Sequence, residues 1–116
     1  MDEILETLSN TAGIDASLLV GKDGLVITQA GRTDDFEVDA VAATASEMYN
    51  SAEQMMSEKS NGGAVETLVF EAARGRYLLN AVNDEVFLMV LAGKKANLGL
   101  VRWETKESAA RLKDVL

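Results

Sequence analysis

The amino-acid sequence predicts an α+β fold in which one β-sheet lies between two layers of helices. Apolar runs of strand length occur first as a pair and then as a set of three, with short turns between them, which is the pattern of β-hairpins. The runs at residues 18–20 and 86–91 are apolar at every position, which is typical of strands buried on both faces. Three segments with apolar residues at helical spacing are available to cover these faces. The prediction is therefore a three-layer α/β/α sandwich with the sheet in the centre.

The first third of the chain predicts a short helix followed by a hairpin. Residues 2–10 place three aliphatic side chains on one helical face. Residues 16–21 and 25–30 form two apolar runs that are joined through Asp23-Gly24. Asp-Gly between such runs is a strong hairpin signal, because both residues tolerate the positive φ of a tight turn.

A long helix is predicted from Asp34 to about Lys59, a stretch that contains no Gly or Pro. Asp34 and Glu37 have the spacing of a capping box, which satisfies two N–H groups at a helix start. The apolar residues cover an arc of roughly 140°, which is wider than the stripe of about 100° that packing on one sheet requires. This arc consists of Val38, Val41, Ala42, Ala45, Met48, Tyr49, Ala52, Met55 and Met56.

The width of this arc suggests a second role for the long helix. Small residues border the arc and would let another helix approach closely, and its methionines suit adaptable interfaces. We therefore expect the helix to contact a second copy of the chain. The simpler alternative is an amphipathic helix that only covers the sheet.

Three further strands and a last helix complete the chain. The strands are predicted at residues 64–72, 76–82 and 85–92, and the helix from about 97 to 116. The run at 64–72 is the most polar of the strands, so we expect it at an edge of the sheet. The long helix suffices for one face, and the first and last helices are expected to share the other.

Two large apolar residues of the last helix, Leu100 and Trp103, lie off its main apolar face. We expect them to pack on the first helix, because so short a helix needs tertiary contacts to be stable. The alternative is a hot spot for a partner protein, where aromatic side chains are enriched.

Composition restricts the class of protein and its partners. A chain of 116 residues, with 47% hydrophobic and 26% charged residues, suits one soluble domain spanning 1–116. The net charge of −8 disfavours nucleic acid and anionic membranes as partners. No apolar run approaches the length that spans a bilayer, and the acidic N-terminus is unlike a signal peptide. We therefore expect a cytoplasmic protein.

The residue types present also disfavour catalysis. The chain has no His and no Cys, which removes the commonest general base, the thiolate nucleophile and the usual zinc ligands. No motif of a nucleophilic serine, a P-loop or a dinucleotide site occurs. We expect no enzyme, and no catalytic, cofactor-binding or metal-binding residue.

Four segments in this order resemble the Roadblock/dynein light chain family in its prokaryotic, MglB-like form. They are LVGKDGLVI at 19–27, AVAATASEMYNSAEQM at 40–55, RGRYLLNAVNDEVFLMVLAG at 74–93 and ANLGLVRWE at 96–104. The resemblance implies a five-stranded antiparallel sheet of order 2-1-5-4-3. It also implies homodimers that form through the third strand and the long helix.

The same resemblance implies a function. Many members regulate or scaffold small Ras-like GTPases, and MglB-type members act on MglA-type GTPases. Expected partners are a second copy of the chain, a small Ras-like GTPase and other Roadblock proteins, with neither nucleic acid nor membrane insertion. MglB-type regulators often extend past the last helix, so stimulation of GTP hydrolysis is left open. The alternatives are a purely structural dimerisation module or a small-ligand sensor with Thr28, Gln29 and Asn80 as inward polar groups.

Two sets of site residues follow from the expected dimer. The dimer interface is expected to comprise Ala40, Thr44, Met48, Ser51, Met55, Val65, Thr67 and Val69. If two long helices pair about a twofold axis, each leaves a polar strip facing outwards. We define the polar strip as Ala43, Glu47, Asn50 and Gln54, which are spaced about one helical turn apart. Following the resemblance, we assign this strip to the GTPase.

Overall fold

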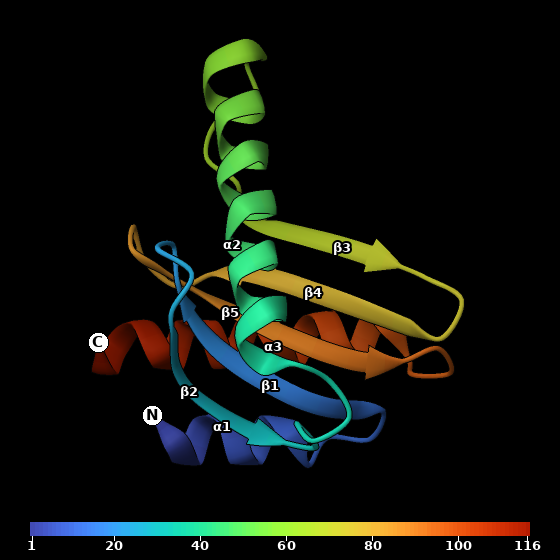
Figure 1. Ribbon diagram of the computed structural model, residues 1–116. Coiled ribbons are helices and arrows are strands. Elements are labelled where there is room, and N and C mark those ends of the chain that lie inside the picture. The colour runs from blue at the N-terminus through green and yellow to red at the C-terminus, as the bar shows by residue number, and fades with distance from the viewer.

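Five strands form one antiparallel sheet in the order β2-β1-β5-β4-β3 (Figure 1). The computed structural model describes residues 1–116. The strands are β1 (Ile14–Gly21), β2 (Val26–Gly31), β3 (Thr67–Glu71), β4 (Gly75–Ala81) and β5 (Val86–Gly93). The helices are α1 (Asp2–Ser9), α2 (Val38–Gln54) with the π-helical turn η1 (Met55–Lys59), and α3 (Leu98–Val115). The predicted fold and strand order are confirmed.

The two strands that the sequence marks as fully apolar lie in the interior of the sheet. β1 is buried at every position except Asp15, and β5 at every position except Gly93. Each has a neighbouring strand on both sides and helices on both faces, which explains why their side chains do not alternate between apolar and polar.

The helices divide between the two faces of the sheet (Figure 1). α1 and α3 cover one face and enclose a core that includes Leu8, Leu88 and Leu112. α2 alone covers the other face, over a core that includes Tyr49 and Phe87. α2 runs across the strands, and its last turns and η1 rise beyond β3.

The start of the long helix differs from the expected capping box. The helix begins at Val38 with Glu37 as the N-cap residue, and no side chain bonds to a cap N–H group. Asp34 lies in the preceding turn. The helical path does reach Lys59 as predicted, but its last turn is π-helical.

The strand β2 is only half buried, although it begins with the apolar pair Val26 and Ile27. Its side chains alternate between partly buried and exposed, because β2 is the other edge of the sheet. A register shift opposite Leu19 and Val20 leaves Ile27 without a partner in β1, and Ile27 is 45% exposed. α1 lies beside this edge, where the Thr28 hydroxyl donates a hydrogen bond to the Asp2 carboxylate at 2.6 Å.

The expected packing of Leu100 and Trp103 on α1 is wrong. Trp103 is 59% exposed, and Leu100 is also exposed. The short helix α1 instead buries Leu5 and Leu8 in the core that it shares with α3. No helix of the chain combines the length and the apolar character that crossing a bilayer would require.

Candidate protein-interaction surfaces

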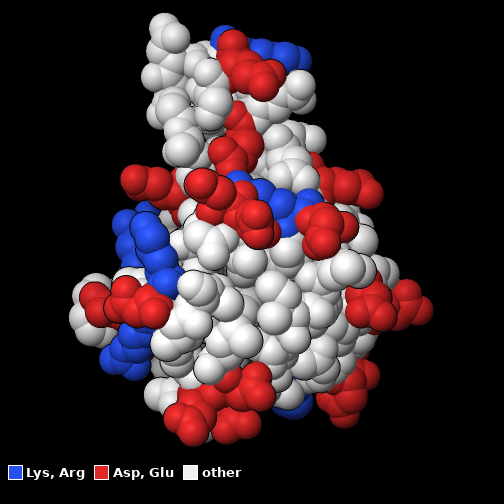
Figure 2. Space-filling model, turned by 90° about the vertical axis from the view of Figure 1, so that its left-hand side faces the viewer, with Lys and Arg blue, Asp and Glu red and all other residues white.

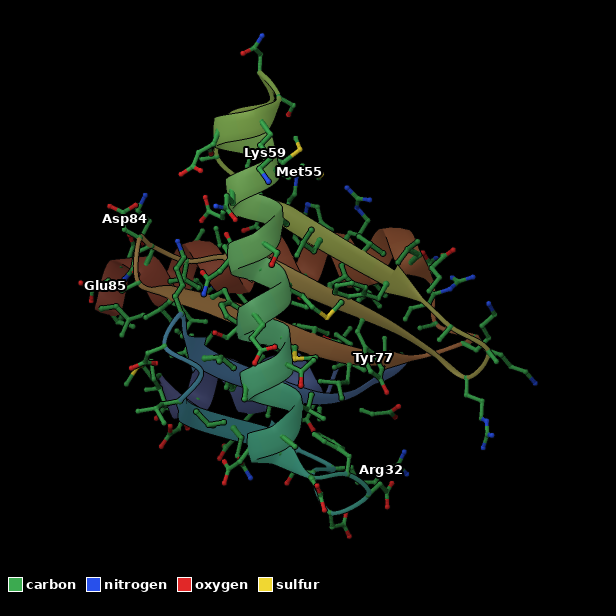
Figure 3. All side chains as sticks on the ribbon, turned by 45° about the horizontal axis from the view of Figure 1, so that its top comes forward. Arg32, Met55, Lys59, Tyr77, Asp84 and Glu85 are labelled. Carbon is green, nitrogen blue, oxygen red and sulfur yellow. The ribbon has the colours of Figure 1, made fainter.

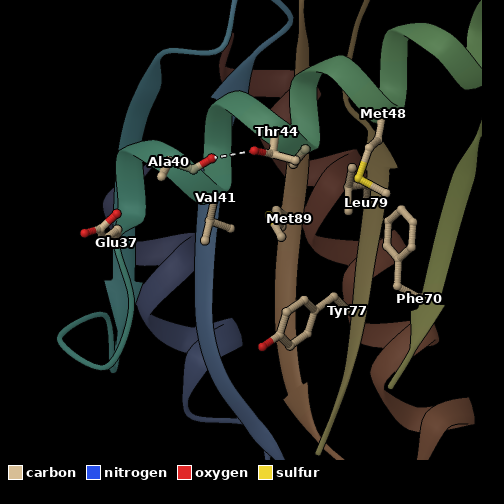
Figure 4. A pocket seen from close by; sticks show the side chains of 10 residues that line it. Glu37, Ala40, Val41, Thr44, Met48, Phe70, Tyr77, Leu79 and Met89 are labelled. Atoms are coloured by element: carbon tan, nitrogen blue, oxygen red, sulfur yellow. Dashed lines mark hydrogen bonds between the residues drawn. The ribbon is translucent and has the colours of Figure 1, made fainter. Parts of the chain in front are cut away.

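An apolar groove lies between α2 and the strands β3, β4 and β5 (Figure 4). It encloses about 530 Å³ and is open to solvent along its length. Eight of its ten lining residues are hydrophobic, so the groove offers apolar surface and few polar partners. The lining residues are Glu37, Ala40, Val41, Thr44, Ala45, Met48, Phe70, Tyr77, Leu79 and Met89.

The alternation of side chains along the strands produces the floor of this groove. Phe70 and Tyr77 are direct cross-strand partners between β3 and β4, and both point to the α2 side (Figure 4). Met48 reaches down from α2 and is 42% exposed, while Tyr77 is also exposed. The hydroxyl that α2 contributes to the lining has a partner, because Thr44 Oγ1 donates to the Ala40 carbonyl at 2.9 Å.

The strand β3 borders the groove and has no neighbouring strand on its outer side. The Ala81 N–H group donates to the Glu66 carbonyl, and the Ala72 N–H group donates to the Gly75 carbonyl. With the register of the two strands, these bonds show that the even-numbered residues of β3 are the ones hydrogen-bonded to β4. Hydrogen-bonded and free pairs alternate in an antiparallel ladder. The N–H and C=O groups of Thr67, Val69 and Glu71 therefore point away from the sheet, where another strand can pair with them.

The eight residues expected at a dimer interface are not equally placed. Ala40, Thr44 and Met48 line the groove, and Ser51 and Met55 continue the same side of the helix beyond the sheet. Figure 3 shows Met55 with Lys59 on the projecting turns.

Of the three interface residues expected in or near β3, two are available to a partner and one, Val65, is buried. Thr67 and Val69 lie in the free edge, and Thr67 also donates a hydrogen bond to Asn80 at 2.8 Å. Val65 precedes the strand and is only 7% exposed, because its side chain lies in the core under α2. Its side chain is therefore not available to a partner. Sequence reasoning missed Phe70 and Tyr77, although the alternation along 67–71 and 75–81 could have placed them on the helix side.

The polar strip lies on the side of α2 that faces the β1–β2 turn, away from the groove. Glu47 and Gln54 are exposed. Asn50 is partly engaged, since its side-chain amide donates to the Lys22 carbonyl at 3.0 Å. Ala43 lies against the turn: a Cβ added to Gly24 would stand 3.5 Å from the Ala43 Cα.

Lys22 ties this turn to α2 and to the β4–β5 turn. Its carbonyl accepts hydrogen bonds from Ser46 at 2.7 Å and from Asn50, and its N–H donates to the Glu85 carbonyl at 2.8 Å. Its ammonium lies 2.8 Å from the Glu53 carboxylate and 5.3 Å from the centre of the Tyr49 ring. Sequence reasoning missed this junction, because nothing in Lys-Asp-Gly signals contacts with residues far along the chain.

Tyr49 lies in the core next to Lys22 and contacts both the sheet and the segment that precedes β3. Its ring stacks on Phe87 with the centroids 5.0 Å apart, and its hydroxyl donates to the Val65 carbonyl at 2.9 Å. Burial, with a smaller contribution from the Glu53 carboxylate, raises the pKa of Tyr49 to about 12. The phenol therefore stays protonated and keeps donating its hydrogen bond at all ordinary pH values.

The polar groups suggested for a small-ligand site do not converge. Thr28 bonds to Asp2 and Gln29 to Thr33, both in exposed positions, while Asn80 pairs with Thr67. None of them lines the apolar groove. No three Asp or Glu side chains come together in a group that could hold a metal ion.

Comparisons with known proteins agree with this architecture. The Roadblock/LC7 domain matches residues 1–92 of the chain. The uncharacterized proteins MJ0714 and MJ1340 of Methanocaldococcus jannaschii are each 36% identical over 115 residues, which cover 97% of this chain and 93% and 96% of theirs. The structure of Myxococcus xanthus MglB is similar with a TM-score of 0.92, at 21% identity, over 98% of this chain and 85% of that one. A Roadblock/LC7 domain from Streptomyces avermitilis has a TM-score of 0.89 at 23% identity, over 99% and 96% of the two chains.

Proposed function

The chain belongs to the Roadblock/LC7 family, and from this premise we propose that it is a non-enzymatic homodimer that regulates or scaffolds a small Ras-like GTPase. The observation that carries the proposal is the apolar groove beside the free edge of β3. A surface of this kind is unfavourable in water and is typical of protein–protein interfaces.

A second copy of the chain is a suitable occupant of this surface. A twofold interface uses the same patch on both subunits, and this patch offers both a groove and a protruding helix. In such a dimer the β3 strands would pair edge to edge and give one continuous sheet. Met48 and Met55 of one copy would lose their exposure against the other. This arrangement would also cover the turns of α2 that rise beyond the sheet.

The polar strip is the surface on which we propose that the GTPase binds. In the proposed dimer the two α2 helices lie side by side, and their polar strips form one composite outer surface. Glu47 is the one charged residue of the strip, and Asn50 and Gln54 are neutral and polar. The action of the strip would be positional, because binding would stabilise one conformation of the switch segments of a GTPase. The resemblance to MglB-type regulators, whose fold the chain shares, supports this class of partner.

The test is binding of an MglA-type GTPase from the source organism, loaded with GDP or with a non-hydrolysable GTP analogue. Wild-type protein is expected to bind one nucleotide form more tightly. Ala43→Arg is expected to abolish binding while the dimer persists, because a long charged side chain blocks approach to the strip. Ala110→Arg is the matched control, since Ala110 is exposed on α3, on the opposite side of the sheet. Equal binding by both variants would contradict the placement on the strip, and no binding by wild type in either nucleotide state would contradict the proposed partner.

A further inference from the structure

We propose that the same partner is anchored by a second feature, an apolar hollow beside the β1–β2 turn, with Leu25 as its central contact. This inference rests on the proposed function and extends the partner surface from α2 onto the hairpin. The hollow, called the turn hollow below, encloses about 540 Å³ between the β1–β2 hairpin and the start of β5. Its apolar lining is Leu25, Val26, Ile27 and Val86, and its acidic border includes Asp23 and Glu85.

Leu25 is unusually exposed for its type. It is 69% exposed, more than any other large hydrophobic residue of the chain, and Ile27 beside it is 45% exposed. Neither residue faces the groove that the dimer would cover, because the groove is lined from α2, β3, β4 and β5. The apolar surface of the turn hollow would therefore remain open in the dimer. A partner that covers it gains the free energy of removing this surface from water.

The turn that carries Leu25 is held rigidly. The Gly21 N–H donates to the Leu25 carbonyl at 2.9 Å, and the Leu25 N–H donates to the Asp23 carboxylate at 3.1 Å. Gly24 has a φ of +93°, which a residue with a side chain rarely adopts. The Lys22 junction then fixes the turn to α2. A backbone that is fixed before binding loses little conformational freedom on binding, so the position of Leu25 on the turn is preorganised for an anchor.

The turn hollow and the polar strip are adjacent. Gly24, next to Leu25 in the chain, lies against Ala43, and Asn50 of the strip bonds to Lys22. A globular protein seated on the strip would therefore meet the turn as well. This contact supplies the large apolar anchor that the strip itself lacks, and interface energy is usually concentrated in such anchors.

The charge around the hollow indicates what the partner must present. Figure 2 faces this end of the molecule and shows a neutral area bordered by many acidic and some basic side chains. Lys22 is the one basic residue that lines the hollow, and its ammonium is paired with Glu53 at 2.8 Å. The other charged residues of the lining, Asp23 and Glu85, are acidic. Figure 3 places Asp84 and Glu85 at this end of the sheet, opposite the end with Arg32 and Tyr77. The complementary surface is an apolar side chain flanked by Lys or Arg. Electrostatic attraction of this kind raises the association rate and weakens as salt is added.

The experiment compares two leucines of similar chemistry in the full-length protein. Leu25→Ser is expected to weaken binding of the nucleotide-loaded GTPase at least tenfold, with the mass of the dimer and its thermal unfolding unchanged. Leu100→Ser is the matched control, because Leu100 is also exposed but lies on α3, and it is expected to bind like wild type. Leu25→Met, which keeps an apolar side chain, is expected to restore most of the affinity.

The outcomes separate this inference from the proposed function. Loss of binding in both Ala43→Arg and Leu25→Ser, with normal binding by Leu100→Ser, supports the composite surface. Loss in Ala43→Arg with wild-type affinity in Leu25→Ser overturns the anchor and leaves the polar strip as the site. Loss in Leu100→Ser with wild-type affinity in Leu25→Ser overturns it in favour of α3. Wild-type protein that binds no GTPase overturns both proposals.

Discussion

The two faces of the sheet are covered to different degrees. α1 and α3 close one face, where only four partly buried apolar residues adjoin the core. α2 covers the other face alone, and nine partly buried apolar residues adjoin its core. The first face is therefore more fully covered within one chain, and the second leaves the apolar surface that the proposed dimer would cover.

Polar groups follow the same division. On the closed face the buried hydroxyl of Ser17 donates to the Leu5 carbonyl at 3.1 Å, and that of Thr105 donates to the Val101 carbonyl at 2.7 Å. On the open face the polar groups in reach of a partner include the outward backbone groups at the β3 edge and the side chains of the polar strip. Substitutions on the closed face should therefore act on folding, and those on the open face on association.

The largest effect on folding is expected from Leu112→Ala, which truncates a fully buried side chain of the closed face. The free energy of unfolding should fall by about 2–5 kcal/mol, since a cavity is left and the helix itself tolerates alanine. Urea denaturation measures this loss. Ile27→Ala, at a position of the edge strand β2 that is 45% exposed, should cost less than about 1 kcal/mol. Similar losses in the two variants would contradict the assignment of Leu112 to the core and of Ile27 to an exposed edge.

A smaller effect, on association alone, is expected from Met48→Glu in the groove. Met48 is substantially exposed in one chain, so the carboxylate remains solvated in the monomer. In the dimer it would be buried without a partner, and we expect the dissociation constant to rise about 100-fold or more. Analytical ultracentrifugation measures this constant. Gln54→Glu adds the same charge on the other side of α2 and should leave the constant nearly unchanged.

The smallest effect is expected at high pH and concerns the core under α2. Because the pKa of Tyr49 is raised from 10.0 to about 12, the folded state keeps this proton after the unfolded state has lost it. The resulting stability is fully present below pH 10 and declines as the pH rises towards 12. Urea denaturation at increasing pH should show a steeper decline for wild type than for Tyr49→Phe. Parallel curves would show that Tyr49 does not couple folding to pH.

The sequence predicted the layers and the assignment of helices to faces because these depend on regular periodicity, whereas the strand order followed from the resemblance to the Roadblock family. Continuous apolar runs identified β1 and β5 as interior strands, and the polar character of 64–72 identified an edge. The resemblance implied the second edge, β2, through the strand order, but the residue pattern alone did not indicate it, because the apolar residues at 25–27 are also typical of a buried strand. Its exposure results from its place in the sheet, which local sequence does not encode.

The candidate surfaces were only partly predictable for a related reason. The breadth of the apolar arc on α2 pointed to Ala40, Thr44 and Met48, which do line the groove. The strand half of the groove, with Phe70 and Tyr77, depends on cross-strand register. The Lys22 junction joins residues that are far apart in the sequence, so no local pattern reveals it. Trp103 lies off the buried face of α3, and periodicity along the chain does not determine whether a neighbouring helix covers such a residue.

The most direct test of the account is the mass of the protein in solution with proline at each edge of the sheet. Val69→Pro removes an outward N–H group of β3. Gln29→Pro is the matched control, because it removes an outward N–H group at the other edge of the sheet. The Arg32 N–H group donates to the Asp15 carbonyl, and with the register of β1 and β2 this bond places the Gln29 N–H group on the outer side of β2. Light scattering after size-exclusion chromatography should give twice 12.4 kDa for wild type and Gln29→Pro, and 12.4 kDa for Val69→Pro. A monomeric wild type at micromolar concentration, or a Val69→Pro dimer as stable as that of Gln29→Pro, would contradict the account.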